Sequence, residues 1–341
     1  MKRVEVTFKF LTPALLAGAD QKSAEMRASS IRGALRWWMN ALGYDKDCIN
    51  DLFGTAAGET GRRSRVIVRD TTPNNLPVKL QSAKDIIGTP YDYFLWPLGN
   101  PENARGVIQA GSTASFSVFL RSGESEDLEK GLKAFLLLGS LGSRSRRCYG
   151  SIWPVRVTID GHEWKIPETI PGMREVLLEI LGKKNLKIDI VDGIMFSKYH
   201  SAIDRCSDFL SRYRRGKTKN GLEASFWGEN DHDAPFGKTD CVYRPILGLP
   251  LTQKYSSGRT VASQIEGYDR LASPVHFKVV SLNGNMVPIV IFFSSMLPPK
   301  GTKVKLVNKN SGNVIKTLPL NFELFNYLKT DEELVNLYNG D

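Results

Sequence analysis

The stretch Val4-Glu5-Val6-Thr7-Phe8-Lys9-Phe10 places an apolar side chain at every second position. This period of two is typical of a β-strand that has one face buried and the other in water. Further along, the apolar residues within 31–42 recur at spacings of three and four, which predicts an amphipathic helix that begins at Ser29 or Ser30 and ends at Gly43. The chain therefore opens with a strand and a helix.

The same alternation of strand and helix continues through the first 160 residues. Ser125-Glu126-Asp127 is a typical helix start, because Ser accepts a hydrogen bond from the first turn and acidic side chains suit its positive end. The predicted elements are a strand at 64–69, a strand at 112–120, a helix at 125–138 and a strand at 151–159. The order β-α-β-β-α-β indicates a ferredoxin-like arrangement with extra, proline-containing material between the two middle strands.

The second half carries strong turn signals. Asn283-Gly284 between two apolar stretches is the strongest short signal for a β-hairpin, and Asn310-Ser311-Gly312 indicates another. The predicted elements are a helix at 203–213, hairpin strands at 274–282 and 286–294, hairpin strands at 304–307 and 314–318, and a last helix that begins at the capping box Thr330-Asp331-Glu332-Glu333. A boundary near Asp160-Gly161 divides the chain into domains of residues 1–160 and 161–341, so we expect an α+β protein of two domains.

Composition excludes several classes of protein. With 341 residues, 41% of them hydrophobic and 24% charged, the chain is neither disordered nor collagen-like nor a coiled coil. Its four cysteines lie far apart without a C-x-x-C pair, which argues against a zinc site and against a secreted disulfide framework. The N-terminus lacks the pattern of a signal peptide, and no apolar run reaches membrane-spanning length. We therefore expect a cytoplasmic protein.

The balance of charge favours an anionic partner. The chain has 46 Lys and Arg against 36 Asp and Glu, a formal net charge of +10. Nucleic acid is the leading interpretation of such an excess, although proteins that merely stay soluble also carry it.

The most informative segment for function is Gly139-Ser140-Leu141-Gly142-Ser143-Arg144-Ser145-Arg146-Arg147-Cys148-Tyr149-Gly150-Ser151, which lies between a predicted helix and a predicted strand. Glycines let backbone N–H groups approach a ligand closely, and arginines supply forked donors that suit phosphate. A tyrosine ring stacks on an RNA base. The candidate RNA-binding residues of this loop are Gly142, Arg144, Arg146, Arg147 and Tyr149. The alternative is a solvated turn; a Walker loop is excluded because no G-K-[ST] follows.

Three further groups of basic residues suit a phosphate backbone. They are a pair four positions apart in the first helix, the densest basic run of the chain, and two arginines around the Gly/Ser-rich residues 256–258. In that order they are Arg32 and Arg36; Arg212, Arg214, Arg215, Lys217 and Lys219; and Arg259 and Arg270. The run follows a predicted helix, and cations also stabilise a helix C-terminus, so both interpretations stay open.

Two adjacent tryptophans in the first helix point in different directions. Trp38 fits the apolar stripe that faces the core, whereas Trp37 lies off that stripe. Trp37 is therefore a candidate for a contact with another subunit or for packing at a boundary.

Several of these segments together resemble the RAMP superfamily of CRISPR proteins, and more narrowly the family of first subunits of type III-B Cmr RNA-targeting complexes. The segments that carry the resemblance are Phe10-Leu11-Thr12-Pro13 with Gly18-Ala19-Asp20, residues 25–38 (EMRASSIRGALRWW), the loop 139–150, Pro245-Ile246-Leu247-Gly248-Leu249-Pro250, and Arg270-Leu271-Ala272-Ser273-Pro274. They extend over most of the chain.

The resemblance implies two tandem ferredoxin-like domains with loop insertions, and a glycine-rich loop that touches RNA. It also implies a place among other RAMP subunits of an effector that holds CRISPR RNA and captures target RNA, with no cofactor or metal and no catalysis by this subunit. Gly142, Arg144, Arg146 and Arg147 match the family's loop, as Arg27, Arg32 and Arg36 match its helix region. The family loop usually has Gly where Cys148 stands.

Two rival functions remain open from the residues. Some relatives in the resembled superfamily cleave RNA without metal, and that chemistry needs an acid and a base, most often histidine. The chain has His162, His200, His232 and His276, none of them in the glycine-rich loop. Asp231-His232-Asp233 lacks a further ligand at metal-binding spacing and is interpreted as a solvated loop. The other rival is a protein–protein scaffold whose basic charge is incidental.

Overall fold

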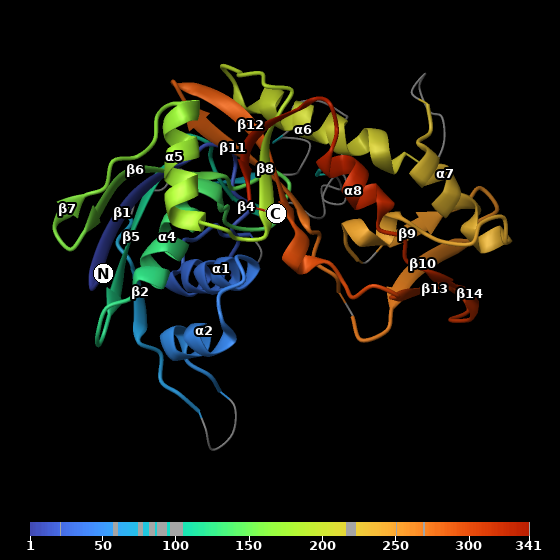
Figure 1. Cartoon of the computed structure of the whole chain (residues 1–341), viewed down its shortest axis with the longest axis horizontal. Coiled ribbons are helices and arrows are strands. Elements are labelled where there is room, and N and C mark those ends of the chain that lie inside the picture. Colours follow the sequence, from blue (N-terminus) through green and yellow to red (C-terminus); the bar gives the residue numbers. More distant parts are fainter. Residues whose placement is uncertain are drawn as a thin grey trace.

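The fold of the chain comes from a computed structural model that describes residues 1–20, 22–56, 61–73, 78–81, 86, 94–95, 105–215, 223–249, 251–268 and 270–340, with the side chains of 78–81 excepted. Three larger antiparallel sheets follow one another along the longest axis of the molecule (Figure 1). No helix of the described part is long and apolar enough to cross a membrane.

The N-terminal sheet has the strand order β2-β5-β1-β6-β7. Its central strand β1 buries Val4, Val6, Phe8 and Phe10 on one face, as the period of two predicts. The strands are β1 (Arg3–Phe10), β2 (Val66–Asp70), β5 (Thr113–Leu120), β6 (Ile152–Ile159) and β7 (His162–Glu163), and the main helices are α1 (Ala28–Ala41) and α4 (Glu126–Leu138). The predicted order β-α-β-β-α-β is therefore present.

The stretch between α1 and β5 contains more structure than the sequence indicated. Helix α2 (Lys46–Phe53) begins at Asp45, whose side chain accepts hydrogen bonds from the first turn. Strands β3 (Val78–Gln81) and β4 (Arg105–Ile108) form a small separate pair. Strands β3 and β4 lie in the stretch that contains the prolines at 73, 77, 90, 97 and 101, a composition that indicates loops.

The middle sheet has the order β11-β12-β8-β15, and the third sheet has the order β14-β13-β10-β9. The strands of the middle sheet are β8 (Leu186–Val191), β11 (Val275–Leu282), β12 (Asn285–Phe293) and β15 (Leu334–Asn339). Those of the third are β9 (Leu251–Lys254), β10 (Thr260–Ile265), β13 (Lys303–Asn308) and β14 (Val314–Pro319). The helices of this half are α5 (Ile170–Leu181), α6 (Tyr199–Arg214), α7 (Phe226–Asp233) and α8 (Glu323–Lys329).

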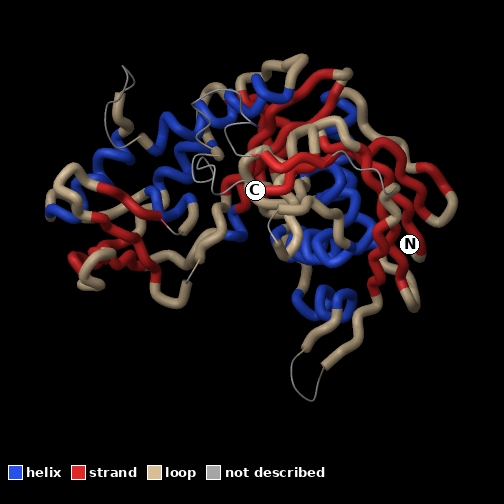
Figure 2. The backbone as a smooth tube through the Cα atoms, turned by 180° about the vertical axis from the view of Figure 1, so that it is seen from behind, coloured by secondary structure: helices blue, strands red, loops and turns tan. Residues whose placement is uncertain are grey.

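The N-terminal and middle sheets share one strand order. In each, the first and third strands in the sequence lie in the centre, with the second and fourth outside them: β2-β5-β1-β6 matches β11-β12-β8-β15. The third sheet consists of two hairpins inserted before β11 and after β12. Helices α1, α4 and α5 lie between the first two sheets, so the strands of the N-terminal sheet form an outer layer (Figures 1 and 2).

Both predicted hairpins are confirmed. Asn283 and Gly284 have φ of 51° and 75°, the left-handed pair that a tight hairpin turn requires. The β13–β14 hairpin lies where the second was predicted.

The predicted last helix is wrong. Thr330 is the C-cap of α8, and residues 334–339 form β15, which pairs with β8. The Asp331 side chain accepts a hydrogen bond from the Glu333 N–H at 2.9 Å, so the acidic residues build a turn that leads into a strand.

The predicted boundary at Asp160-Gly161 falls in the turn between β6 and β7. Strand β7 still pairs with β6, so residues 162–163 belong to the N-terminal sheet. The division into domains at that point stays a prediction.

Candidate nucleic-acid interface

The glycine-rich loop, residues 139–151, joins α4 to β6, and its glycines serve the close packing of its own backbone. Gly142 has a φ of +94°, and a Cβ there would lie 2.7 Å from the carbonyl oxygen of Leu15. Gly150 has a φ of +68°, and a Cβ there would lie 1.8 Å from the oxygen of Leu141. Both positions therefore require glycine for folding, and the close approach expected toward a ligand is made toward the protein itself.

Hydrogen bonds fasten this loop to the edge of β11. The Cys148 N–H donates to the oxygen of Phe277 at 2.9 Å, and the Phe277 N–H donates to the oxygen of Arg146 at 3.1 Å. Cys148 has a φ of +67°, a conformation that favours glycine.

Arg147 and Tyr149 face inward from the loop. The Arg147 guanidinium donates to the oxygen of Val275 at 2.8 Å and lies over the ring of Phe277. It therefore ties the loop to the second half of the chain. The Tyr149 side chain is only 2% exposed, so the expected stacking of its ring on a base is wrong: the ring belongs to the core.

The loop lines one wall of a groove with a volume of about 740 Å³. The other walls come from the segments around residues 247–252 and 270–273 and from the end of α6. Arginines from three distant parts of the sequence line it: Arg144, Arg146, Arg147, Arg214 and Arg270. No Asp or Glu is among the described residues that line the groove, so the charged side chains among them are all positive.

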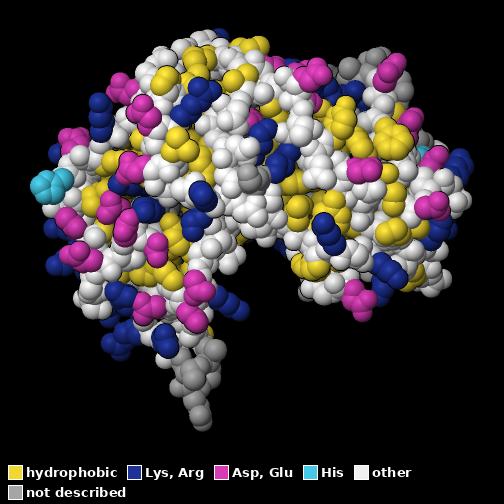
Figure 3. All heavy atoms as spheres, viewed as in Figure 1, with side chains coloured by type: hydrophobic (Ala, Val, Ile, Leu, Met, Phe, Trp, Pro, Cys, Tyr) yellow, Lys and Arg dark blue, Asp and Glu magenta, His cyan; other side chains and the backbone are white. Residues whose placement is uncertain are grey.

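Positive charge is otherwise dispersed. On the face drawn in Figure 3, Lys and Arg side chains are interspersed with Asp and Glu. Because mixed surface charges largely cancel at a distance, the excess of +10 alone does not locate a partner. The groove is distinguished by five arginines among its described lining residues, none of which is Asp or Glu.

The two arginines of the first helix lie elsewhere and stabilise a neighbouring helix. Arg32 donates to the oxygen of Phe53, and Arg36 donates to the oxygen of Gly54 at 3.2 Å. Both carbonyls are at the C-terminus of α2, where cations balance the helix dipole. Neither arginine is among the groove-lining residues.

The remaining candidate arginines also lie outside the groove lining. Arg27 pairs with Glu25 at 2.9 Å, and Arg215 donates to the oxygen of Glu223 at 3.1 Å. Arg259 is in the turn between β9 and β10. Lys217 and Lys219 fall outside the described residues.

His276 is a buried residue of β11. It is 5% exposed, and its ring stacks on Trp37 with centroids 5.1 Å apart. Burial, with Arg146 and Arg147 nearby, holds the pKa of His276 well below its usual value, so the ring is neutral. Trp37 therefore packs at the boundary between the two halves, and Trp38 is in the core as predicted.

Asp231-His232-Asp233 is not a solvated loop, which corrects the interpretation from the sequence. These residues end α7, and Asp231 is 2% exposed. Its carboxylate accepts hydrogen bonds from the N–H groups of Tyr243 and Arg244, both at 2.8 Å. Within the described part of the chain, no three His, Cys, Asp or Glu side chains gather in the manner of metal ligands.

We expect Gly142→Ala to lower the free energy of unfolding by about 2 kcal/mol, since the new Cβ meets backbone and φ stays in the left-handed region. Urea unfolding measures this loss. The matched control is Gly312→Ala, where φ is also positive but nothing lies within 4 Å of the added atom. Equal losses in the two variants would show that the close backbone contact at Gly142 does not contribute to the free energy of unfolding.

Comparison with known proteins gives consistent matches. The family model described as the RAMP superfamily matches residues 7–153. The CRISPR system Cmr subunit Cmr1-1 of Pyrococcus furiosus is 30% identical over 322 residues, which are 87% of this chain and 88% of that protein. Subunit Cmr1-2 of the same organism is 28% identical over 169 residues, 42% of this chain and 89% of that protein. The crystal structure of Cmr1 from Pyrococcus furiosus in its apo form matches the whole of both chains with a TM-score of 0.61 and 19% identity.

Proposed function

Because this chain belongs to the RAMP superfamily and, within it, to the Cmr1 family of CRISPR system Cmr subunits, we propose that it is a non-catalytic RNA-binding subunit of a type III-B Cmr effector complex. One observation carries the proposal: five arginines line a single groove in which no described residue is acidic. The groove contacts CRISPR RNA, target RNA or both.

Single-stranded RNA has the chemistry that this groove fits. Forked guanidinium donors pair with phosphate oxygens, and none of the described lining residues carries a negative charge that would repel a polyanion. Contacts to a sugar–phosphate backbone carry no sequence information. The subunit therefore reads charge and shape, and base pairing within the complex supplies sequence specificity.

Absence of catalysis is part of the same proposal. Attack by a 2′-hydroxyl group on the neighbouring phosphate needs a base, most often His or a carboxylate. Among the described residues that line the groove, none is His, Asp or Glu. The alternative, a metal-independent endoribonuclease, remains an outcome of the test below.

We further propose that the two halves are tandem ferredoxin-like domains in a cytoplasmic assembly with other RAMP subunits. The shared strand order of the N-terminal and middle sheets supports the repeat. The third sheet is then an insertion in the second domain.

The test is the binding of labelled single-stranded RNA to the wild-type protein across a series of salt concentrations. Five phosphate contacts to a single strand give a slope of log K against log salt of about −3.5, so affinity falls about 130-fold between 50 and 200 mM salt. The same samples are run on a denaturing gel. We expect intact RNA; discrete metal-independent fragments would contradict the non-catalytic proposal, and no binding at low salt would favour a scaffold.

A further inference from the structure

A second, smaller pocket opens beside the groove, between α1, the glycine-rich loop and β11. Its volume is about 140 Å³, close to the roughly 150 Å³ of an engineered cavity that holds benzene. It therefore has room for one small group. Ser145 and Arg146 line both the pocket and the groove, so the two are adjacent.

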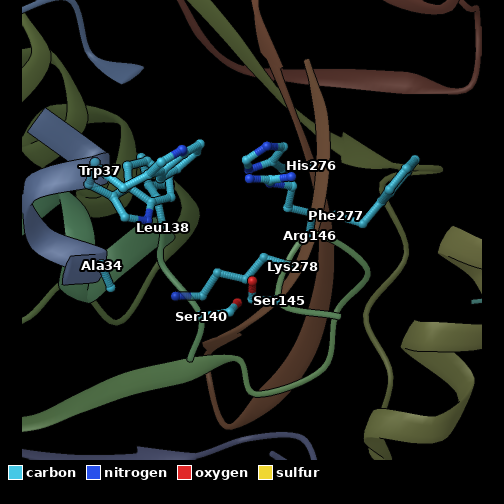
Figure 4. A pocket seen from close by; sticks show the side chains of 10 residues that line it. Ala34, Trp37, Leu138, Ser140, Ser145, Arg146, His276, Phe277 and Lys278 are labelled. Atoms are coloured by element: carbon cyan, nitrogen blue, oxygen red, sulfur yellow. The ribbon is translucent and has the colours of Figure 1, made fainter. Parts of the chain in front are cut away.

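Donor groups from both halves of the chain face this pocket. Figure 4 shows Lys278 reaching from β11 toward Ser140, with Trp37 of α1 across the pocket from His276. Arg146 lies over the Trp37 ring, 5.4 Å from its centroid. The polar lining consists of a guanidinium, an ammonium, two hydroxyl groups and the neutral imidazole of His276, and none of the described lining residues is Asp or Glu.

Lys278 is an unusual residue to find here. Its side chain is 1% exposed, and its ammonium donates to the oxygen of Gly139 at 2.7 Å and to that of Leu136 at 3.5 Å. It thereby binds the C-terminal carbonyls of α4 across the boundary between the halves. Two carbonyls occupy two of its three N–H donors, and neither neutralises a full charge.

The burial of two basic side chains, Lys278 and Arg146, indicates that the pocket suits an anion. Burial lowers the pKa of both Lys278 and Arg146, because each loses water without gaining a carboxylate. Burial thus disfavours the charged forms of both groups, and an anion bound between them would favour those charged forms again. Phosphate oxygens accept hydrogen bonds from guanidinium, ammonium and hydroxyl donors, whereas the single N–H of the neutral His276 ring faces the oxygen of Ser273 at 3.0 Å.

We propose that this pocket binds the terminal phosphate of an RNA strand that lies in the groove. The inference rests on the proposed RNA-binding function and adds the chemical group that the strand presents at its end. A phosphodiester within a strand carries a nucleoside on both sides and does not fit a volume of about 140 Å³. A terminal phosphate monoester has a nucleoside on one side only. With its phosphate in the pocket, that nucleoside lies beyond Arg146, in the groove.

The experiment compares three RNAs of one sequence, with a 5′-phosphate, with a 3′-phosphate, and with hydroxyl groups at both ends. We expect the wild-type protein to bind one of the two phosphorylated RNAs about 10-fold more tightly than the hydroxyl RNA. The gain is modest because the cost of desolvating the phosphate largely offsets the few charge-assisted hydrogen bonds that it forms. Lys278→Met, a similar shape without charge, should abolish this preference. Arg146→Gln is the second variant if Lys278→Met does not fold, as judged by circular dichroism.

The control variant is Arg270→Ala, in the groove but not in the pocket. It should weaken binding of all three RNAs and keep the preference. Equal affinity of the wild type for all three RNAs would overturn the pocket proposal while leaving the groove proposal intact. Absence of binding for every RNA would overturn both.

Free phosphate is the other source of the same chemistry. Thermal unfolding in inorganic phosphate is compared with unfolding in chloride at matched ionic strength. Stabilisation by phosphate that disappears in Lys278→Met, without any preference among RNA ends, would show a site for free phosphate and would contradict the terminal-phosphate proposal.

Discussion

Alanine at Arg144, Arg214 and Arg270 together is expected to weaken the binding of single-stranded RNA by about 100-fold, since each charge-assisted contact to a phosphate contributes on the order of 1 kcal/mol. The slope of log K against log salt should also become shallower by about 2, because three fewer phosphates are neutralised. Filter binding or fluorescence anisotropy at several salt concentrations measures both quantities.

These three residues are chosen because the side chains of the other two groove arginines contact the aromatic residues and β11 against which the loop packs. Arg147 fastens the loop to β11, and Arg146 lies over Trp37. Substituting them would mix a loss of RNA contacts with a change in packing. Arg144, Arg214 and Arg270 come from separate segments, so a combined loss also tests whether the groove acts as one surface.

A variant with the same change in net charge is the control. Arg63, Arg121 and Arg156 are exposed and lie outside the groove. Their replacement by alanine should change RNA affinity less than about threefold, an effect of overall charge alone. If both triple variants lose affinity equally, binding depends on net charge and the groove proposal fails.

The sequence predicted the strands and helices whose pattern is local. The period of two in β1, the capping Ser125 of α4 and the Asn283-Gly284 turn each depend on neighbouring residues, and each is confirmed. Strand β15 was missed because its existence depends on pairing with β8, whose partner residues lie 143 (Leu334 and Val191) to 152 (Asn339 and Lys187) positions away in the sequence. Short elements that tertiary pairing stabilises leave little local signal.

The candidate site could be predicted only in part, because the composition of a loop is local but the partners of its side chains are not. The unusual composition of the loop pointed to Arg144, Arg146 and Arg147, and the groove brings them together with Arg214 and Arg270. The helix pair Arg32 and Arg36 looked equivalent, yet the carbonyls at the end of α2 bind it. Which arginine faces a ligand and which one caps a helix depends on partners far along the chain. Lys278 had no local signal at all, since an alternating strand does not reveal that its polar residue is buried.

Asp231→Ala is expected to lower the free energy of unfolding by about 4 kcal/mol, the largest loss of stability predicted for a single substitution. The carboxylate and the Arg244 guanidinium form a buried pair, with side chains 2% and 9% exposed and an Oδ2 to Nε distance of 3.2 Å. Removing Asp231 leaves that guanidinium without its counter-charge and deprives two buried N–H groups of their acceptor. Urea unfolding followed by circular dichroism measures the loss.

Loss of the Asp231–Arg244 pair should also disturb the groove. Arg244 also donates from Nη1 to the carbonyl oxygen of Arg214 at 3.0 Å, so the buried pair positions the end of α6 from which the Arg214 side chain enters the groove. Asp231→Asn keeps an acceptor oxygen but removes the charge, and its loss of stability should be intermediate. Asp233→Ala is the matched control, because the Asp233 side chain is 40% exposed and pairs with the exposed Lys238 at 3.6 Å. Surface pairs contribute about 0–1 kcal/mol, so equal losses in Asp231→Ala and Asp233→Ala would show that burial of the Asp231–Arg244 pair does not stabilise the second half of the chain.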